Sequence, residues 1–385
     1  MRSHNIILAI CIFLALFTYI YITYQSWKQQ QHLALVFENF QSISTFNTNN
    51  TNNSAIAEDN TNNDNADNNT ANTILLVWSQ MIQPNSSQSI LLFNYQKQYY
   101  IRLMNNHNII ARGFDTLDEL QNMMSTCCLP ITKPNLDSLN NKILSKYKNS
   151  TPIIQKYLQY WSPKIQLAKS IHGLESNMPH TQSNVLMMPE YWWEKPDFST
   201  FMHELVHVHQ RLQPNEWNIL YKKYWHFEYI SGLDSGKVRG LDSIIARSRM
   251  NPDGTDFNWL WMGAKDGRPR WIGAVYPIGR KPKLTHVDYV SVPLDPVSNI
   301  SNAGGYLLPT IYHNGQNLPL ISDDREFMTF FGVKANNYHP NELGAQMMEE
   351  YIKQTPVNAR TDIVGNIPAF TAFKLWLQND IKWLA

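Results

Sequence analysis

A short histidine and glutamate motif near the middle of the chain restricts the local fold more than any other feature. The segment Phe201–His207 reads FMHELVH and contains the pattern HExxH. Residues four apart on an α-helix lie on the same side, about one turn from each other. His203 and His207 can therefore bind one zinc ion, while the carboxylate of Glu204 stays free to act as a base. The motif has this meaning only if the segment is helical.

The flanking residues predict such a helix. Asp197 and Ser199 are candidate N-caps, and Pro214 ends the segment after roughly fourteen residues. At about 100° per residue, its apolar side chains form one stripe, made of Phe201, Leu205, Val208 and Leu212. His203 and His207 fall nearly opposite this stripe. We therefore expect one side of the helix to pack on a core and the other to face a cleft.

The motif resembles the active-site helix of the zincin metallopeptidases. Downstream, the segment His339–Ala345 reads HPNELGA and resembles the second helix of the gluzincin branch, whose glutamate is the third zinc ligand. The resemblance covers roughly residues 150 to 355, and HExxH is its specific part, because the ExxA pattern alone is weak. It implies an α+β, zincin-like domain with a mixed sheet over the HExxH helix and a second helix that carries a glutamate ligand.

The residues after the motif exclude one branch of that family. The metzincin pattern requires glycine and histidine where this chain has Gln210 and Gln213. His209 points away from the edge that carries the other two histidines, so we expect it to be a core histidine or to support a ligand from behind.

Two glutamates compete for the third ligand position. Glu228 lies 21 residues after His207, close to the thermolysin-like spacing, but the aspartate expected four residues later is Gly232. Glu342 falls in the first turn of a helix that Pro340 would begin. A carboxylate held on a packed helix makes the better fixed ligand, so the sequence favours Glu342.

The resemblance implies a zinc peptidase mechanism for these residues. His203, His207 and Glu342 would leave one zinc position open for water, and Glu204 would take its proton and later protonate the leaving amine. Gln346 stands where many gluzincins carry a carboxylate that orients a zinc histidine. An oxyanion donor is also needed, and the candidates are Tyr338, His339, Tyr312 and His313.

A strand that precedes the active-site helix is expected to form the substrate edge. In zincins such a strand pairs with an extended peptide or protein substrate. The segment Met178–Met188 resembles it, and Val185, Leu186 and Met187 are its central residues. The aromatic run Tyr191–Trp193 either lines the cleft or packs in the core.

Two other functions remain open beside a peptidase. The first is a catalytically silent, zincin-like binding or structural module, which the intact Glu204 argues against, because a binding domain needs no base between the two histidines. The second is a zinc-dependent hydrolase of another bond. The net charge of +1 and pI near 7.7 give no sign of a nucleic-acid partner.

The N-terminus predicts a membrane anchor. After a tail of residues 1–5, the uncharged run Ile6–Tyr24 would span about 28 Å as a helix, close to the thickness of the hydrocarbon core. It lacks a small-residue cleavage site and ends in aromatic residues, so an uncleaved single-pass anchor is favoured over a signal peptide. Arg2 and Lys28 nearly balance, and the orientation stays open. The Asn- and Thr-rich residues 25–73 predict a disordered tether, with accidental sequons at Asn49, Asn52 and Asn68.

The remaining chain divides into a small α+β part, residues 74–150, and the zincin-like domain, residues 151–385. In the first part, Ile90–Phe93 and Tyr99–Leu103 suggest a hairpin, and Asp115–Met124 a helix. The adjacent thiols of Cys127 and Cys128 are expected to be buried or free, because three cysteines make no disulfide framework.

The long segment between Pro214 and Pro340 is rich in Trp, Tyr, Gly and Pro. Phe257–Met262 and Trp271–Tyr276 flank a turn-rich link and predict a second hairpin. Asn251–Gly254 predicts a plain turn.

Overall fold

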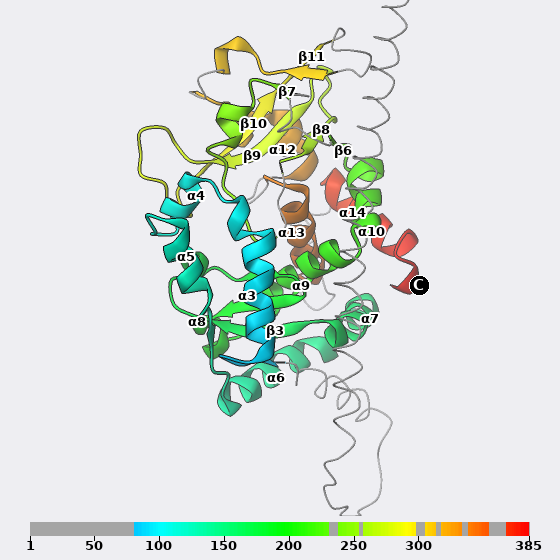
Figure 1. Ribbon diagram of the computed structural model, residues 1–385. Helices are drawn as coiled ribbons and strands as arrows, with labels where there is room; N and C mark the ends of the chain where they lie inside the picture. The colour runs from blue at the N-terminus through cyan, green and yellow to red at the C-terminus, as the bar shows by residue number, and fades with distance from the viewer. Residues whose placement is uncertain are drawn as a thin grey trace, which may run out of the picture. The chain divides into compact units, whose positions relative to one another are not determined.

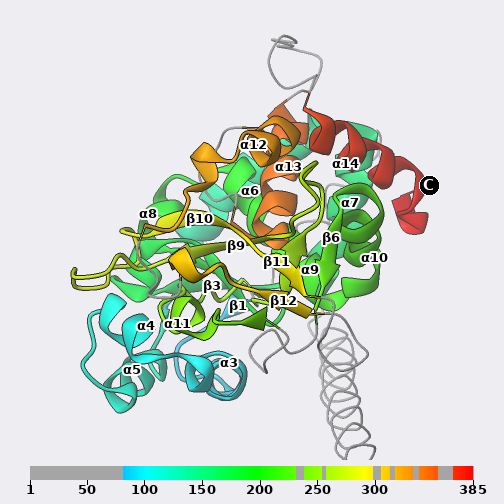
Figure 2. The same cartoon turned by 90° about the horizontal axis from the view of Figure 1, so that it is seen from above.

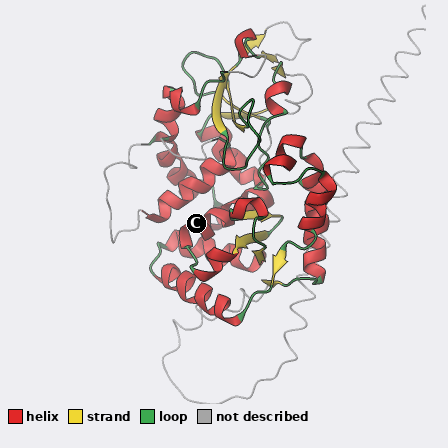
Figure 3. Ribbon diagram, turned by 90° about the vertical axis from the view of Figure 1, so that its left-hand side faces the viewer, coloured by secondary structure: helices red, strands yellow, loops and turns green. Residues whose placement is uncertain are grey.

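The computed structural model describes residues 81–230, 238–253, 257–297, 305–312, 317–332, 338–353 and 367–384 (Figure 1). They belong to one compact unit, Asn65–Ala385. Helices and three sheets mix along this part of the chain, so the predicted α+β class is confirmed (Figure 3). The predicted anchor and tether, with their sequons, lie outside the described residues. Within those residues, every helix is too short or too polar to cross a membrane.

The first sheet has the strand order β1-β3-β5-β4, with β2 paired to β3. Its parallel strands are β1 (Met81–Ile82), β3 (Gln166–Ser170) and β5 (Val185–Pro189). Two short strands run antiparallel to their neighbours, β2 (Cys128–Leu129) against β3 and β4 (His180–Gln182) against β5. Residues 81–150 therefore share this sheet with the segment that precedes the HExxH helix.

Both faces of the first sheet are buried. Leu186 and Met188 on one face join the main core with α6 (Lys133–Lys148) and α7 (Pro152–Trp161). Val185 and Met187 on the other face join a second core with α3 (Ser87–Tyr99), α4 (Asn106–Ala111) and α5 (Leu117–Met124). Figure 2 shows these two groups of helices on opposite sides of β1 and β3. A strand buried on both faces reads as a continuous apolar run, as β5 does.

The prediction that Val185, Leu186 and Met187 form an open substrate edge is wrong. Strand β5 pairs with β3 along its whole length and with β4 from Val185 to Met187, so it lies inside the sheet. The chain reverses at Ser183, whose φ is +56°, and this tight turn lays β4 along the edge. The edge strand on this side is β4.

The predicted hairpin between Ile90 and Leu103 is also wrong. The chain forms helix α3, and the Ser86 side chain caps it by accepting a hydrogen bond from Ser89 N at 3.1 Å. A short 3-10 helix, Ile101–Leu103, follows. The helix predicted over Asp115–Met124 is confirmed as α5, where Thr116 and Glu119 form a capping box. Cys127 and Cys128 are buried free thiols, as expected.

The HExxH motif lies on helix α9 (Phe198–Leu212), whose predicted limits are confirmed. The Asp197 carboxylate caps it by accepting from Thr200 N at 2.7 Å. Of its predicted apolar stripe, Phe201, Leu205 and Val208 are fully buried, whereas Leu212 at the end of the helix is exposed. Before it, α8 (Glu190–Glu194) sends two indoles into the core, while Tyr191 is 55% exposed. Helix α13 (Pro340–Lys353) packs along α9 (Figure 1) and begins at the predicted proline.

Two further sheets are built from the segment between α9 and α13. The second has the antiparallel order β10-β9-β8-β6, and the third the order β11-β12-β7. Their strands are β6 (Phe227–Tyr229), β7 (Val238–Arg239), β8 (Trp259–Trp261), β9 (Arg270–Val275), β10 (Asp288–Pro293), β11 (Asp295–Val297) and β12 (Gly305–Leu307). The antiparallel pair β8 and β9 confirms the hairpin predicted there. In Figure 1, α9 lies between the first sheet and the second.

Short helices complete the fold around these sheets. Helix α10 (Pro214–Ile219) continues into a π-helical turn (Leu220–Tyr224), and α11 (Asp242–Ile245) precedes the second hairpin. Helices α12 (Arg325–Phe331) and α14 (Pro368–Asn379) pack on each other and close the main core. The core therefore joins α9, α13 and α14 and fixes the positions of the two helices that carry the HExxH and ELGA segments.

Candidate metal centre

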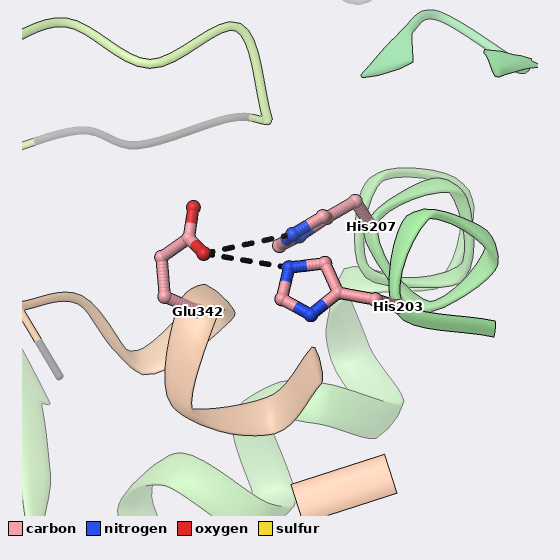
Figure 4. A group of neighbouring side chains, drawn as sticks. All are labelled: His203, His207 and Glu342. Carbon is pink, nitrogen blue, oxygen red and sulfur yellow. Dashed lines mark ion pairs between the residues drawn. The ribbon is translucent and has the colours of Figure 1, made fainter. Parts of the chain in front are cut away.

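Helices α9 and α13 bring three predicted ligands together (Figure 4). Glu342 Oε2 lies 3.6 Å from His203 Nε2 and 3.9 Å from His207 Nε2. The three ligand atoms all lie within 4.8 Å of one another, although Glu342 follows His207 by 135 positions. The N-terminus of α13 carries Glu342 in its first turn, as Pro340 predicted.

The Nδ1 atom of each imidazole contacts a second side chain, which fixes the orientation of the ring. His203 Nδ1 lies 2.6 Å from Glu349 Oε1, and His207 Nδ1 lies 2.8 Å from Gln210 Oε1. Gln210 in turn donates from Nε2 to the backbone carbonyl of Asn341 at 2.8 Å. Because both acceptors hold a proton on Nδ1, Nε2 is the ring nitrogen of each histidine that remains to bind a metal, and it faces Glu342. The orienting carboxylate that is missing at Gln346 is thus supplied one turn later.

The residues fit a zinc ion, and two buried atoms show why. His207 Nε2 and Glu204 Oε2 are buried without a hydrogen-bond partner among the described residues. Such an orphaned polar group costs about 1–3 kcal/mol, so a fold keeps it where a ligand compensates. Two imidazole nitrogens and one carboxylate oxygen are the donor set of a zinc site that keeps a fourth position open.

The electrostatic field of this cluster favours a positive charge. Burial opposes the imidazolium form of His203, but the nearby carboxylates of Glu342 and Glu349 outweigh it and hold its pKa well above the ordinary value. Burial likewise opposes the charged form of Glu342, yet His207 and His203 lower its pKa to about 2. A cation bound between these groups would take the place of the proton on His203.

Glu204 has the properties of a buried base. It is 4% exposed, and burial, reinforced by the nearby carboxylate of Asp253, raises its pKa well above the ordinary value. Asp253 itself is held by hydrogen bonds from Thr181 N at 2.7 Å and Thr181 Oγ1 at 2.9 Å. Burial lowers the pKa of His207. A carboxylate with a raised pKa accepts and returns a proton near neutral pH more readily than an exposed one.

The sequence missed the contribution of the segment that begins at Asn251. We predicted a plain turn there, but Asn251 Nδ2 donates to the Oε1 atom of Glu342 and, at 2.7 Å, to the Tyr338 hydroxyl. Asp253 lies close enough to Glu204 and His207 for the three to form a second candidate metal-binding group. No local pattern announces these contacts, because the partners lie far away along the chain.

The four candidates for the oxyanion donor lie in different parts of the chain's structure, and one of them is outside the described residues. Tyr338 lines the cavity beside the metal centre, with its hydroxyl 3.3 Å from Glu342 Oε1. His339 lies at the start of α13, where its Nδ1 accepts from Asn341 N at 3.0 Å. Tyr312 packs against the apolar cluster between the second and third sheets, which includes Leu260 and Val290, and His313 lies outside the described residues. Tyr338 is therefore the candidate that the fold brings to the cluster.

Two further predictions concerned residues near the motif. Glu228 lies exposed on β6 and belongs to neither candidate ligand group of the described residues, whereas Glu342 lies beside both histidines. His209 is buried away from the cluster, where Nδ1 contacts the Tyr157 hydroxyl at 2.9 Å and Nε2 contacts Glu216 at 2.9 Å. The structure therefore agrees with both choices.

No protein-family model, no curated protein and no solved structure matches this chain. The support for a function therefore lies in the side chains themselves, and above all in the convergence of two imidazoles and one carboxylate beside a second, unpartnered carboxylate.

Proposed function

We propose that this chain is a zinc-dependent peptidase with a zincin-like fold, tethered to a membrane by its N-terminal apolar segment. The observation that carries the proposal is the convergence of His203 Nε2, His207 Nε2 and Glu342 Oε2, next to the unpartnered Oε2 of Glu204. The membrane part rests on the uncharged run of residues 6–24 alone.

A bound zinc ion would act as a Lewis acid and lower the pKa of a coordinated water to about 7. The residues of the chain have separate roles around it. Glu204 accepts a proton on Oε2 and later gives it to the leaving amine. Tyr338, whose hydroxyl lies next to Glu342, is placed to donate a hydrogen bond to the developing oxyanion.

A silent binding module is the second candidate, and Glu204 argues against it. A buried carboxylate without a hydrogen-bond partner destabilises the fold, and a binding protein gains nothing from it. Burial and the nearby carboxylate of Asp253 raise the pKa of Glu204, as a general base requires at neutral pH.

The proposal is tested on the purified full-length chain in detergent. Zinc content is measured first, and cleavage of a broad peptide library is then followed by mass spectrometry. We expect one zinc per chain and library cleavage by the wild type, and the same zinc content without cleavage in Glu204→Gln. The exposed Glu194→Gln is the matched control and should behave as the wild type does.

Two results would contradict the proposal. Full zinc occupancy in a His203→Ala/His207→Ala double variant would show that these histidines do not bind the zinc. Cleavage by Glu204→Gln at the wild-type rate would show that Glu204 is not the general base. Zinc binding without any cleavage by the wild type would favour the silent module.

A further inference from the structure

The cavity beside the metal centre extends to a buried arginine. It has a volume of about 210 Å³, and its lining includes Glu204 and Glu342 of the metal centre as well as Arg249, His180 and Tyr338. Arg249 follows helix α11 and is only 9% exposed. A guanidinium therefore lines the same small cavity as the reacting groups.

Arg249 has no counter-ion among the described residues, in contrast to the other buried arginine of this region. Arg112 lies 2.8 Å from Glu175 and forms a buried ion pair with it. The Nε atom of Arg249 is buried without a hydrogen-bond partner among the described residues. Two phenols lie beside the guanidinium: its Cζ lies 5.9 Å from the ring centre of Tyr338, and the Tyr289 side chain also contacts it. A buried cation without a paired anion is costly, so a fold that keeps one is suited to an anionic ligand.

The charges around Arg249 restrict which anion fits. Glu342 and Glu175 act on the guanidinium from a distance without pairing with it. Their field would repel a doubly charged group such as a phosphate more strongly than it repels a singly charged one. A single carboxylate, which a guanidinium binds with two parallel hydrogen bonds, is the better match.

His180, which also lines the cavity, has a second polar atom without a partner among the described residues, and this favours a peptide ligand. His180 is 1% exposed, and its Nδ1 lies 3.1 Å from the Met178 carbonyl, to which it donates. The other nitrogen, Nε2, is buried without a partner in the described structure and is left as an acceptor. A peptide that carries a carboxylate offers both an anion for Arg249 and an amide N–H for His180, which an inorganic anion does not.

We propose that Arg249 binds a carboxylate of the substrate and makes the enzyme prefer peptides with a negative charge close to the scissile bond. The inference rests on the proposed peptidase function. Tyr338 indicates how far Arg249 lies from the metal centre, because its hydroxyl lies 3.3 Å from Glu342 while its ring flanks Arg249. One tyrosine side chain spans the length of one or two extended residues, at about 3.4 Å each. The carboxylate is either the C-terminal group or an acidic side chain of the peptide.

The test measures binding on a full-length, zinc-loaded Glu204→Gln background, so that no substrate is consumed. Three random hexapeptide libraries are compared: one with a free C-terminus and no acidic side chain, one amidated and containing Glu, and one amidated with Gln in place of Glu. Each is applied to the background protein, to a version that adds Arg249→Gln, and to one that adds Arg247→Gln. Arg247 is the matched control, because it donates to the Tyr276 carbonyl outside the cavity.

We expect one or both carboxylate libraries to bind about 10- to 100-fold more tightly than the neutral one, as is typical of hydrogen bonds to a charged group. Arg249→Gln should reduce this ratio to near one, and Arg247→Gln should keep it. Whichever acidic library binds identifies the source of the carboxylate. The ratio of kcat/KM between the same libraries, with Glu204 restored, should change in parallel.

Three outcomes would overturn the inference. These are equal binding of all libraries by the background protein, a preference that survives Arg249→Gln, and an equal loss for all libraries together with lower zinc content in that variant. The last would mean that Arg249 only balances the charge of Glu342. Binding that depends on Arg249 without cleavage by wild-type protein would support the carboxylate site and reject the peptidase.

Discussion

Glu349 Oε1 lies 2.6 Å from His203 Nδ1, the imidazole nitrogen that faces away from Glu342. Both glutamates belong to α13, seven residues apart, so one helix supplies a candidate metal ligand and also the carboxylate that orients another ligand. Helix α13 therefore determines the geometry of the site as much as the HExxH helix does.

Removing this orienting group should weaken the site without abolishing it. We expect Glu349→Ala to lower zinc affinity about 10- to 100-fold, because His203 loses the hydrogen bond that fixes its ring and raises its basicity. Affinity is measured by competition with a chelating dye. Glu350→Ala, the next residue on the same helix, is the control and should retain wild-type affinity; unchanged affinity in Glu349→Ala would show that the contact has no role in metal binding.

Substitution of Glu342 and of Glu228, the two candidates for the third ligand, should have clearly different effects on zinc binding. Glu342→Ala removes a buried carboxylate that lies 3.6 Å from His203 Nε2, so zinc affinity should fall by more than 100-fold and zinc should no longer raise the melting temperature. Glu228→Ala on the exposed face of β6 should leave both quantities unchanged. The same two assays, zinc competition and thermal unfolding with and without zinc, apply to both variants. The opposite ranking would overturn the assignment.

Zinc affinity should rise with pH. In the metal-free protein the pKa of His203 is held well above its ordinary value, so the imidazole is protonated near pH 7 and zinc must displace that proton. Affinity should therefore increase about tenfold per pH unit between pH 6 and 8, as competition for one proton requires.

The metal-free protein should show the opposite trend. A raised pKa contributes stability that is complete below about pH 6.5 and is lost as the pH rises through the higher value of the folded state. Calorimetric titrations and denaturant unfolding at pH 6, 7 and 8 measure the two trends. A zinc affinity independent of pH would mean that His203 is neutral before the metal binds.

Gly344 allows the close approach of α13 to α9. A Cβ atom at this position would lie 2.6 Å from the buried indole of Trp217 and 2.8 Å from Gln210 Nε2. In an exposed helix, glycine to alanine stabilises by about 1 kcal/mol, but overpacking a tight contact costs about 1–3 kcal/mol.

We expect Gly344→Ala to reduce the free energy of unfolding by about 1–2 kcal/mol. It should also weaken zinc binding, because Gln210 orients His207. Denaturant unfolding and zinc competition test both effects, with Gln346→Ala on the same helix as the control. A more stable variant with wild-type zinc affinity would contradict the packing argument.

The sequence predicts those parts of the site that lie on single helices. His203, Glu204 and His207 follow from a pattern of five residues and the caps of α9, and Glu342 follows from the proline that begins α13. In both cases the signal is local, because helical periodicity places neighbours in the sequence on one face. Helical periodicity places Glu349 on the same face of α13 as Glu342, but only the packing of α13 on α9 determines which turn reaches His203.

Errors in the sequence-based prediction come from non-local packing. The apolar run Ile90–Phe93 reads as a strand but lies in α3, where Ile90 and Leu91 are exposed. The run Tyr99–Leu103 covers the end of α3 and the 3-10 helix that follows it. At Ser183 a single residue with positive φ converts one apparent strand into a hairpin. The segment from Asn251 reaches Glu342 across 91 positions, and no periodic pattern encodes such a contact.

The ion pair between Arg112 and Glu175 gives the N-terminal helices a mechanical role. Glu175, Ser176 and Asn177 have φ values of +46°, +56° and +61°, and such a left-handed run of non-glycine residues persists only where its surroundings hold it. This run leads into Met178 and His180 on the cavity wall. Arg112, next to helix α4, holds the run through its ion pair with Glu175. The N-terminal helices, which contain no proposed ligand, thus stabilise the cavity wall. A chain that began at residue 151 would keep every proposed ligand, but the wall beside Arg249 would lose the contact with Arg112.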